Sequence, residues 1–363
     1  MRASYGVVGN SSIGNYAARG LYNLSGSYKG QPGFRPSQLA NPNLTWEESR
    51  SVNLATDWSL WNGRFTGSIN AYRKITTDLL LGRQLPVSSG YGSITENIGE
   101  LLNRGFDLEL ETINVETDDF FWSTRFNASV NQNEVLELQE GAESLNPSGV
   151  LPTAVGHSLE AWKVPVWAGV NPADGTPLYR DADGNLTYQP GPEDDQFVDG
   201  GEHDVVGGFG TELGYKGLSL RVLFNYSYGG NNLPNTQRTW TSAFGEGVLA
   251  DLKDRWREEG DIASYPRSTP FGDFSNADDP GGITTRWLYN SSYIRLRNAT
   301  LSYDLPGALT SPVGLSSARV YASGTNLLTW TTYLGIDPEV ADALESSSYP
   351  TEQQINFGVE VSL

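Results

Sequence analysis

The sequence lacks several residue types and patterns, and each absence excludes a class of protein. There is no cysteine among the 363 residues, so disulfides, thiolate metal sites and a catalytic thiol are excluded. Only two histidines are present, His157 and His203, and neither has the nearby partners typical of a metal site or a catalytic dyad. No run of about 18 apolar residues occurs, which excludes a transmembrane helix. We therefore expect neither an enzyme nor a protein that holds a metal or another cofactor.

Basic side chains are also scarce. The chain has 24 Lys and Arg against 43 Asp and Glu, which gives a formal net charge of −19. Nucleic acid is not an expected partner, because binding to phosphates needs a basic surface. The acidic excess fits either acidic extracellular loops or a salt-rich habitat.

The N-terminus carries no hydrophobic signal sequence. Residues 2–9 (RASYGVVG) instead already read as a strand. Because an outer-membrane protein needs a signal for export, we expect this chain to be a truncated part of a longer protein.

Aromatic residues and turn formers are abundant. Aromatic side chains make up 11% of the chain, and there are 41 Gly and 19 Pro. This mixture favours many strands joined by turns over a helical bundle. A membrane β-barrel is compatible with the missing apolar run, since only alternate residues of its strands face lipid.

The strongest signal is strict alternation of apolar and polar residues. It is seen in residues 52–60 (VNLATDWSL), 64–71 (RFTGSINA), 106–112 (FDLELET), 122–131 (WSTRFNASVN), 218–228 (LSLRVLFNYSY) and 355–363 (INFGVEVSL). Leu223 is an exception, because it falls among the polar positions of its segment. Such strands have one apolar and one polar face. Their expected length of about 9–14 residues suits a tilted membrane strand better than a soluble sheet.

One segment changes phase. In residues 293–303 (YIRLRNATLSY) the apolar positions move from even to odd numbers. Either a β-bulge lies near Arg297 or Asn298, or the strand begins only at Asn298.

Short and long connections alternate along the chain. Short turns are expected at residues 61–63, 116–119 and 215–217, and long loops at about 78–99, 134–204, 230–291 and 331–352. Bacterial outer-membrane barrels have short periplasmic turns and long extracellular loops. Residues 251–259 are expected to form a short helix within one long loop.

The loops contain the candidate ligand-binding residues. Trp162, Trp167, Trp240 and Trp256 lie in loops or at strand edges, where aromatic rings either stack on sugars or pack the loops together. Residues 181–185 (DADGN) hint at a calcium loop but lack the spaced ligands and distal Glu of an EF-hand. A plain turn is the favoured interpretation, with loose calcium binding by residues 193–195 (EDD) as the alternative.

A series of motifs, in order, resembles the SusC/RagA-like TonB-dependent transporters. The motifs are RASYGVVGN (2–10), IGNYA (13–17), NPNLTWE (41–47), TTDLL (76–80), NIGE (97–100), NRG (103–105), GGF (207–209), YKGL (215–218), YIRLRN (293–298), NLLTWT (326–331) and GIDPE (335–339). No single motif is decisive, but their order extends over nearly the whole chain. The last residue departs from the family, whose barrels commonly close with an aromatic residue, since Leu363 stands there.

The resemblance implies an all-β fold, an antiparallel transmembrane β-barrel in the outer membrane. Residues 1–363 would form the C-terminal portion of that barrel, a partial barrel without the family's plug domain. The complete protein would import an oligosaccharide or a peptide. A SusD-like surface lipoprotein would be its partner, and TonB would supply energy through the missing plug region.

Other interpretations compete with energised import. The chain could be a passive outer-membrane pore or structural barrel without energy coupling, or a non-functional gene fragment. A secreted soluble β-protein that binds glycans would have shorter strands and no lipid-facing aromatic residues.

Overall fold

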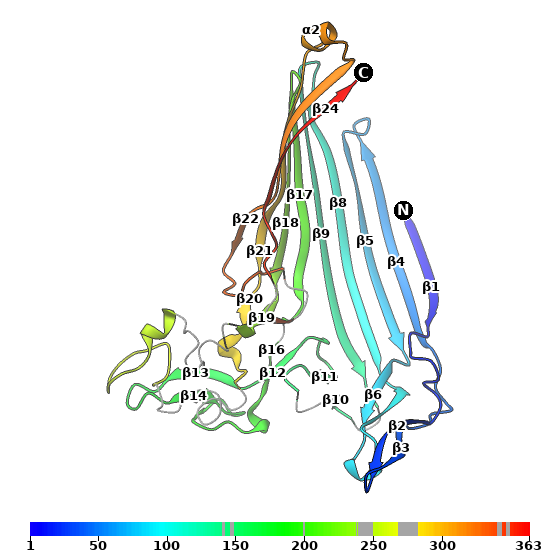
Figure 1. Cartoon of the computed structure of the whole chain (residues 1–363), viewed down its shortest axis with the longest axis vertical. Coiled ribbons are helices and arrows are strands. Elements are labelled where there is room, and N and C mark those ends of the chain that lie inside the picture. Colours follow the sequence, from blue (N-terminus) through cyan, green and yellow to red (C-terminus); the bar gives the residue numbers. More distant parts are fainter. Residues whose placement is uncertain are drawn as a thin grey trace. The chain divides into compact units, whose positions relative to one another are not determined.

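The computed structural model describes residues 1–139, 142–145, 149–198, 200–236, 238, 250–267, 282–339, 343–345 and 349–363 (Figure 1). The chain divides into two compact units. Unit 1 consists of Met1–Thr56, Asn70–Phe106 and Asn131–Ala161, and unit 2 of Asp57–Ile69, Asp107–Val130 and Trp162–Leu363.

Ten long strands form the main sheet, in the order β1-β4-β5-β8-β9-β17-β18-β21-β22-β24. Their bounds are β1 Arg2–Asn10, β4 Glu47–Leu60, β5 Phe65–Thr77, β8 Glu100–Glu116, β9 Phe120–Glu137, β17 His203–Tyr215, β18 Leu218–Gly229, β21 Tyr293–Asp304, β22 Ser317–Thr331 and β24 Gln354–Ser362. The pairing of β1 with β4, of β9 with β17 and of each later neighbour is antiparallel. The predicted all-β class is confirmed, and β8 and β9, with 17 and 18 residues, are longer than expected.

The three predicted tight turns are present, and backbone conformation explains two of them. Trp61, Asn62 and Gly63 have φ angles of 52°, 57° and 84° between β4 and β5. Lys216 and Gly217 have φ angles of 47° and 87° between β17 and β18. Two successive residues with positive φ give the turn twist that matches paired strands, and glycine adopts it without steric cost.

A β-bulge explains the phase change in β21. On the β18 side, Leu296 pairs with Phe224 and Asn298 pairs with Leu223, so Arg297 is the extra residue. The bulge shifts the alternation by one position, so the apolar residues after it lie on the same face as the apolar residues before it. Of the two predicted alternatives, the bulge is therefore confirmed, since β21 begins at Tyr293.

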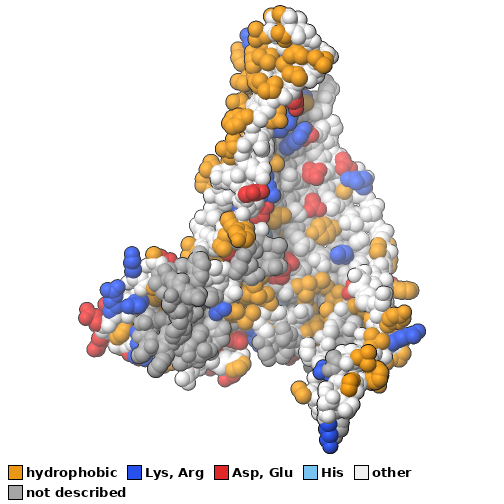
Figure 2. All heavy atoms as spheres, viewed as in Figure 1, with side chains coloured by type: hydrophobic (Ala, Val, Ile, Leu, Met, Phe, Trp, Pro, Cys, Tyr) orange, Lys and Arg blue, Asp and Glu red, His pale blue; other side chains and the backbone are white. Residues whose placement is uncertain are grey.

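Apolar side chains remain exposed on one face of the strands. On β24, the exposed fractions of Ile355, Phe357, Val359 and Val361 are 66%, 81%, 66% and 57%. Figure 2 shows hydrophobic side chains gathered around the turn ends of β22 and β24. A row of exposed apolar side chains of this kind marks a surface that water does not normally cover.

The loops carry small sheets of their own. Unit 1 contains the pairs β2–β3 (Leu21–Tyr28, Gln31–Gln38), β6–β7 (Leu80–Gln84, Ser93–Asn97) and β10–β11 (Ser144–Leu145, Thr153–Ala154). Unit 2 contains β12–β16 (Trp162–Val164, Gln196–Val198), β13–β14–β15 (Val166–Val170, Pro177–Arg180, Leu186–Thr187) and β20–β19–β23 (Tyr289–Asn290, Asn231–Pro234, Leu344–Glu345). Fully buried Trp162, Tyr179 and Leu233 belong to these small sheets. Most of the buried apolar side chains therefore lie in the loops, and the main strands contribute only Leu102, Val135 and Ala318 among the described residues.

Helical segments are short. Those with fully described bounds are η1 Val87–Ser89, η2 Pro192–Asp194, η3 Ala250–Asp254, η4 Thr285–Trp287, α2 Gly307–Thr310 and η5 Ser311–Val313. No helix in the described part of the chain has the length and apolar composition to cross a bilayer.

The helix expected over residues 251–259 is only partly correct. The helical turn η3 ends at Asp254. Beyond it, the backbone N–H of Trp256 donates to the carbonyl of Tyr265 (2.9 Å), and its indole N–H donates to the carbonyl of Pro172 (2.9 Å). These tertiary contacts hold the following residues in a non-helical path.

Candidate functional site

The polar positions of β17 to β24 form ladders of opposing charges. Glu212 of β17 lies directly opposite Arg221 of β18, with 2.9 Å between Oε1 and Nη2. Asp304 of β21 lies opposite Arg319 of β22, with 2.6 Å between Oδ1 and Nε. Arg319 also lies 4.0 Å from Glu360 of β24. Because cross-strand neighbours share a face, strand register alone places these pairs.

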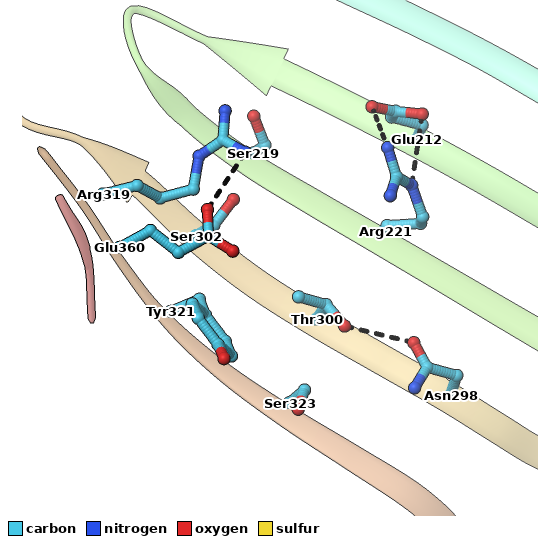
Figure 3. A pocket seen from close by; sticks show the side chains of 10 residues that line it. All are labelled: Glu212, Ser219, Arg221, Asn298, Thr300, Ser302, Arg319, Tyr321, Ser323 and Glu360. Carbon is cyan, nitrogen blue, oxygen red and sulfur yellow. Dashed lines mark hydrogen bonds and ion pairs between the residues drawn. The ribbon is translucent and has the colours of Figure 1, made fainter. Parts of the chain in front are cut away.

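Hydroxyl groups fill the space between the charges. A cavity of about 340 Å³ is lined by Glu212, Ser219, Arg221, Asn298, Thr300, Ser302, Arg319, Tyr321, Ser323 and Glu360, and these ten residues are called the polar groove (Figure 3). The Thr300 hydroxyl donates to Asn298 Oδ1 at 3.1 Å. Guanidinium groups donate, carboxylates accept and hydroxyls do both, so the groove suits a ligand rich in hydrogen-bonding groups.

The ring of Tyr321 lies where a side chain at Gly358 would otherwise be. It lies opposite Gly358 of β24, and a Cβ on Gly358 would collide with the tyrosine ring. Glycine at this position therefore lets the ring lie flat over the neighbouring strand.

A second cluster of charges, at the opposite end of β21, is buried. The Arg295 side chain is 4% exposed and lies 2.5 Å from both Asp337 and Glu339. Its guanidinium also donates to the hydroxyls of Thr329 and Thr351, each at 3.0 Å. We call these five residues the Arg295 cluster. It ties the connection between β22 and β24 to the wall of strands.

The Arg295 cluster lowers the pKa of one carboxyl. Burial acts to raise the pKa of Asp337, but hydrogen bonds from the Thr351 hydroxyl, from the backbone N–H groups of Glu339 and Thr351, and from Arg295 outweigh it. The pKa of Asp337 is therefore held at about 2. Hydrogen bonds to the charged form are the cause of such shifts.

Two of the sequence motifs meet in this cluster. Arg295 belongs to YIRLRN, and Asp337 and Glu339 belong to GIDPE. Arg297, the bulge residue, bridges Glu339 (3.1 Å) and the side chain of Asn326 (3.0 Å), which belongs to a third motif. The motif residues therefore serve to anchor a loop.

Motifs in unit 1 have a similar structural role. The side chain of Asn97 donates to the carbonyls of Thr45 (2.9 Å) and Asp78 (3.0 Å) and accepts from the N–H of Thr45 (2.8 Å). Glu47 accepts from the N–H of Leu80 at 2.9 Å. Three segments that were noted only for their resemblance thus form one strand-to-loop junction.

The candidate tryptophans lie in different settings. Trp162 is fully buried, and its indole N–H donates to the carbonyl of Asn231 at 2.9 Å. Trp167 and Trp256 are half-buried. Trp240 lies outside the described residues.

Trp167 belongs to a stack of rings around one cation. The guanidinium carbon of Arg286 lies 4.6 Å from the centre of the Trp167 ring, 4.3 Å from Tyr265 and 4.9 Å from Trp287. Trp167 also meets Tyr179 edge-on, at 5.6 Å between ring centres. Cation–π contacts of this kind stabilise a loop, so part of the Trp167 surface is used in packing.

Neither of the acidic segments considered for calcium is arranged as a cage. Asp181 accepts from the N–H of Asn185 at 2.7 Å, and Asp194 accepts from the N–H of Gly191 at 2.8 Å, so both carboxylates take part in turns. Within the part of the chain that the structure describes, no group of three or more His, Asp or Glu is placed to hold a metal ion. His203 instead contacts the buried Ser291 hydroxyl at 3.1 Å.

The residues of the polar groove were not singled out in the sequence. Their only sequence signal is that they occupy the polar positions of alternating strands, which many other residues also do. Knowledge of which strands pair, and in which register, is needed to bring Arg221 and Arg319 into one cavity.

The chain matches one family model and several named relatives. The model for the TonB dependent receptor-like beta-barrel matches residues 1–327. TonB-dependent receptor P26 of Formosa agariphila is 31% identical over 400 residues, covering 100% of this chain and 39% of the relative. TonB-dependent receptor SusC of Bacteroides thetaiotaomicron is 27% identical over 391 residues, covering 99% of this chain and 37% of the relative.

A solved structure agrees with these matches. The structure of the RagAB peptide transporter superposes with a TM-score of 0.88 at 28% identity, covering 99% of this chain and 40% of that one. The chain thus spans about two fifths of the length of the curated relatives that it matches.

Proposed function

The chain belongs to the TonB-dependent receptor-like β-barrel family, and from this premise we propose that it forms barrel wall and outer loops of an outer-membrane importer. The imported nutrient would be a large hydrophilic molecule, either an oligosaccharide or a peptide. Energy would come from TonB, and a SusD-like surface lipoprotein would close over the outer loops.

The polar groove is the observation that carries this proposal. It is lined by pairs of opposite charge, such as Arg221 with Glu212, and by several side-chain hydroxyl groups. Matched charges leave little net field, so a neutral hydrophilic solute exchanges hydrogen bonds along the wall without being held by one strong site. The exposed apolar residues of the other face, such as Phe357, would contact lipid.

The proposed partners follow from the relatives. One solved relative is described as a peptide transporter named RagAB, and others are named TonB-dependent receptors. We extend to this chain the outer-membrane location, the lipoprotein partner and the TonB coupling of the family. The half-buried Trp167 and Trp256 remain our candidates among the tryptophans for contacts with substrate.

We also propose that residues 1–363 are the C-terminal part of the receptor's barrel. In support, the chain spans about two fifths of its curated relatives. The plug through which TonB acts would then lie in the rest of the receptor.

Uptake in the native bacterium tests the proposal. Labelled oligosaccharides and peptides are supplied to wild-type cells, to a deletion of this gene and to a strain without TonB. The proposal expects uptake of one substrate class to be lost in both mutants. Uptake that survives loss of TonB but not of this gene would indicate a passive pore, and unchanged uptake in the deletion would indicate a non-functional gene.

A matched pair of variants connects import to the groove. Arg221→Glu places two like charges opposite each other, and we expect about a tenfold loss of uptake if substrate contacts there are worth about 1.4 kcal/mol. Arg50→Glu is the control, because it reverses the charge of an exposed ion pair, that of Arg50 with Glu48, outside the groove.

A further inference from the structure

Three strands of the main sheet carry a glycine that lies beneath an aromatic ring of the neighbouring strand. The glycines belong to β5, β17 and β24, and the rings to β4, β18 and β22. In each case a Cβ added to the glycine would collide with the ring. We call these contacts the ring–glycine pairs, which are Gly67 with Trp58, Gly207 with Tyr226 and Gly358 with Tyr321.

Backbone conformation does not account for these three glycines. None of them has a positive φ angle, so the backbone would accommodate another residue. Glycine inside a strand is unfavourable, because it loses more conformational freedom on folding and has no side chain to pack. At Gly210, also in β17, a Cβ would meet nothing closer than 3.6 Å. What distinguishes the glycines of the ring–glycine pairs is therefore the ring that lies over each of them.

The pair in β17 and β18 shows how such a contact depends on register. Tyr226 lies directly opposite Gly207, and its hydroxyl reaches across the glycine to donate to the carbonyl of Asn127 in β9 at 2.9 Å. If β18 moved along β17 by two residues, Tyr226 would lie opposite Val205 or Phe209 instead. The side chain of either residue would occupy the space that the ring needs, so this contact forms in one register.

The register of β24 against β22 is not set by the means that set the other hairpins. Residues 332–353 join the two strands, and a connection of that length does not fix register as a two-residue turn does. Alternation does not fix it either, because a shift of two residues keeps every side chain on its own face. The ion pair of Arg319 with Glu360 adds little, since its atoms are 4.0 Å apart and its side chains are 49% and 65% exposed.

The third ring–glycine pair distinguishes the registers that alternation leaves equivalent. Tyr321 lies directly opposite Gly358, the sole glycine of β24. A shift of two residues in one direction places Tyr321 opposite Asn356, and a shift in the other places it opposite Glu360. Either side chain would collide with a ring that lies flat on the neighbouring strand, as the Cβ of an alanine at position 358 would.

We propose that the ring of Tyr321, packed on Gly358, specifies the register in which β24 pairs with β22. Aromatic side chains over strand glycines are an effective means of fixing register, because ring and glycine fit only each other. The inference does not depend on what the receptor imports. It concerns a contact between two strands of this chain and the assembly of the sheet.

Pairs of introduced cysteines report the register, because this chain has no cysteine of its own. Ser317→Cys and Ser362→Cys lie directly opposite each other in the observed register. Ser323→Cys comes opposite Gln354→Cys only after a shift of two residues in one direction. Arg319→Cys comes opposite Ser362→Cys only after a shift in the other direction. Directly opposite positions suit a disulfide, whereas diagonal neighbours are too far apart.

Disulfide yields are measured in the complete receptor in native outer membranes, with any cysteine outside this chain replaced by serine. Only the folded, heat-modifiable band is scored, so a lower folding yield does not affect the result. With Tyr321 and Gly358 unchanged, we expect the disulfide of the observed register to dominate. Gly358→Ala and Tyr321→Ala should each lower the ratio of that disulfide to the shifted ones about tenfold.

The two substitutions act from opposite sides. Gly358→Ala penalises the observed register, whereas Tyr321→Ala removes the penalty on the shifted registers and adds no group that could prevent folding. A purely stabilising contact would lower the stability of both variants and leave every disulfide in the observed register. That outcome in Tyr321→Ala, or in both variants, would overturn the inference.

The β17–β18 hairpin is the matched control. It has the same kind of ring–glycine pair, but the tight turn at Lys216 and Gly217 fixes its register independently. Gly207→Ala should therefore lower stability without a shift.

Cysteine pairs check this control as well. Gly214→Cys with Ser219→Cys reports the observed register of the hairpin, and Glu212→Cys with Ser219→Cys reports a shift of two residues. In Gly207→Ala we expect the first disulfide alone. A shifted disulfide there would show that any weakening of the sheet permits slippage, which would contradict a specific role of Tyr321 and Gly358.

Discussion

Arg295 and Arg319 belong to neighbouring strands but have opposite surroundings. Arg295 is 4% exposed and lies among Asp337, Glu339 and two threonines, whereas Arg319 is 49% exposed and pairs with an equally exposed Asp304. Arg295 belongs to YIRLRN, one of the motifs that resemble SusC/RagA-like transporters, whereas Arg319 lies in none of these motifs. Removing one partner of a buried ion pair is costly, while an exposed pair contributes little. The motif residues around Arg295 therefore hold a loop in place, whereas strand residues outside the motifs, such as Arg319, form the surface available to a solute.

Among the substitutions proposed, Arg295→Met should have the largest effect on folding free energy. It leaves the carboxylates of Asp337 and Glu339 without their buried cation, which we expect to cost about 3–5 kcal/mol of folding free energy. The measurement is the midpoint of urea unfolding of the receptor in lipid vesicles, together with protease cleavage in the connection between β22 and β24. Arg319→Met is the control. Equal effects of the two variants would contradict the structural role of the Arg295 cluster.

Acid should remove part of the same stabilisation. The pKa of Asp337 is about 2 in the folded protein, below its value of about 3.9 in an unfolded chain. Its contribution is therefore fully present above about pH 4 and is lost as the pH falls through about 2, a loss of about 2–3 kcal/mol. Unfolding free energies of wild type and Asp337→Asn should converge over that window. Curves that run parallel between pH 5 and 2 would show that Asp337 is not stabilised as the structure indicates.

Gly358→Ala tests how Tyr321, a residue of the polar groove, packs against the neighbouring strand. The added methyl group collides with the Tyr321 ring, and we expect this overpacking to cost about 1–3 kcal/mol. In a Tyr321→Ala background the same substitution should cost much less. An unchanged cost in that background would mean that Tyr321 does not lie over Gly358.

The exposed pair should show the smallest effect. A double-mutant cycle of Asp304→Asn and Arg319→Met should give a coupling of about 0.2–1 kcal/mol, because each side chain is 49% exposed. A coupling above about 2 kcal/mol would mean that water does not reach this face.

Much of the fold was predictable from local pattern. Alternation depends only on neighbouring residues, and it identified β4, β5, β8, β9, β18, β21 and β24 but not β17 or β22. Asn62-Gly63 and Lys216-Gly217 marked tight turns through their backbone freedom. The change of phase at Arg297 indicated the bulge. The motif resemblance to SusC/RagA-like transporters is confirmed by the family match over residues 1–327.

The sites were less predictable because they depend on contacts between distant segments. Asp337 meets Arg295 across 42 positions of sequence, and nothing local in either motif indicates the other. The helix expected over residues 251–259 was shortened by the distant partners of Trp256. The polar groove depends on which strands pair and in which register, and no local pattern in the sequence gives that register.

Cysteine accessibility along β21 tests the central claim, that the main sheet separates a wet polar face from a lipid-covered one. Single cysteines at residues 298–303 are labelled in native outer membranes with a water-soluble maleimide. We expect labelling at Asn298, Thr300 and Ser302 and protection at Ala299, Leu301 and Tyr303. Equal labelling at all six positions would show that the sheet is wet on both faces and that no lipid-covered face exists.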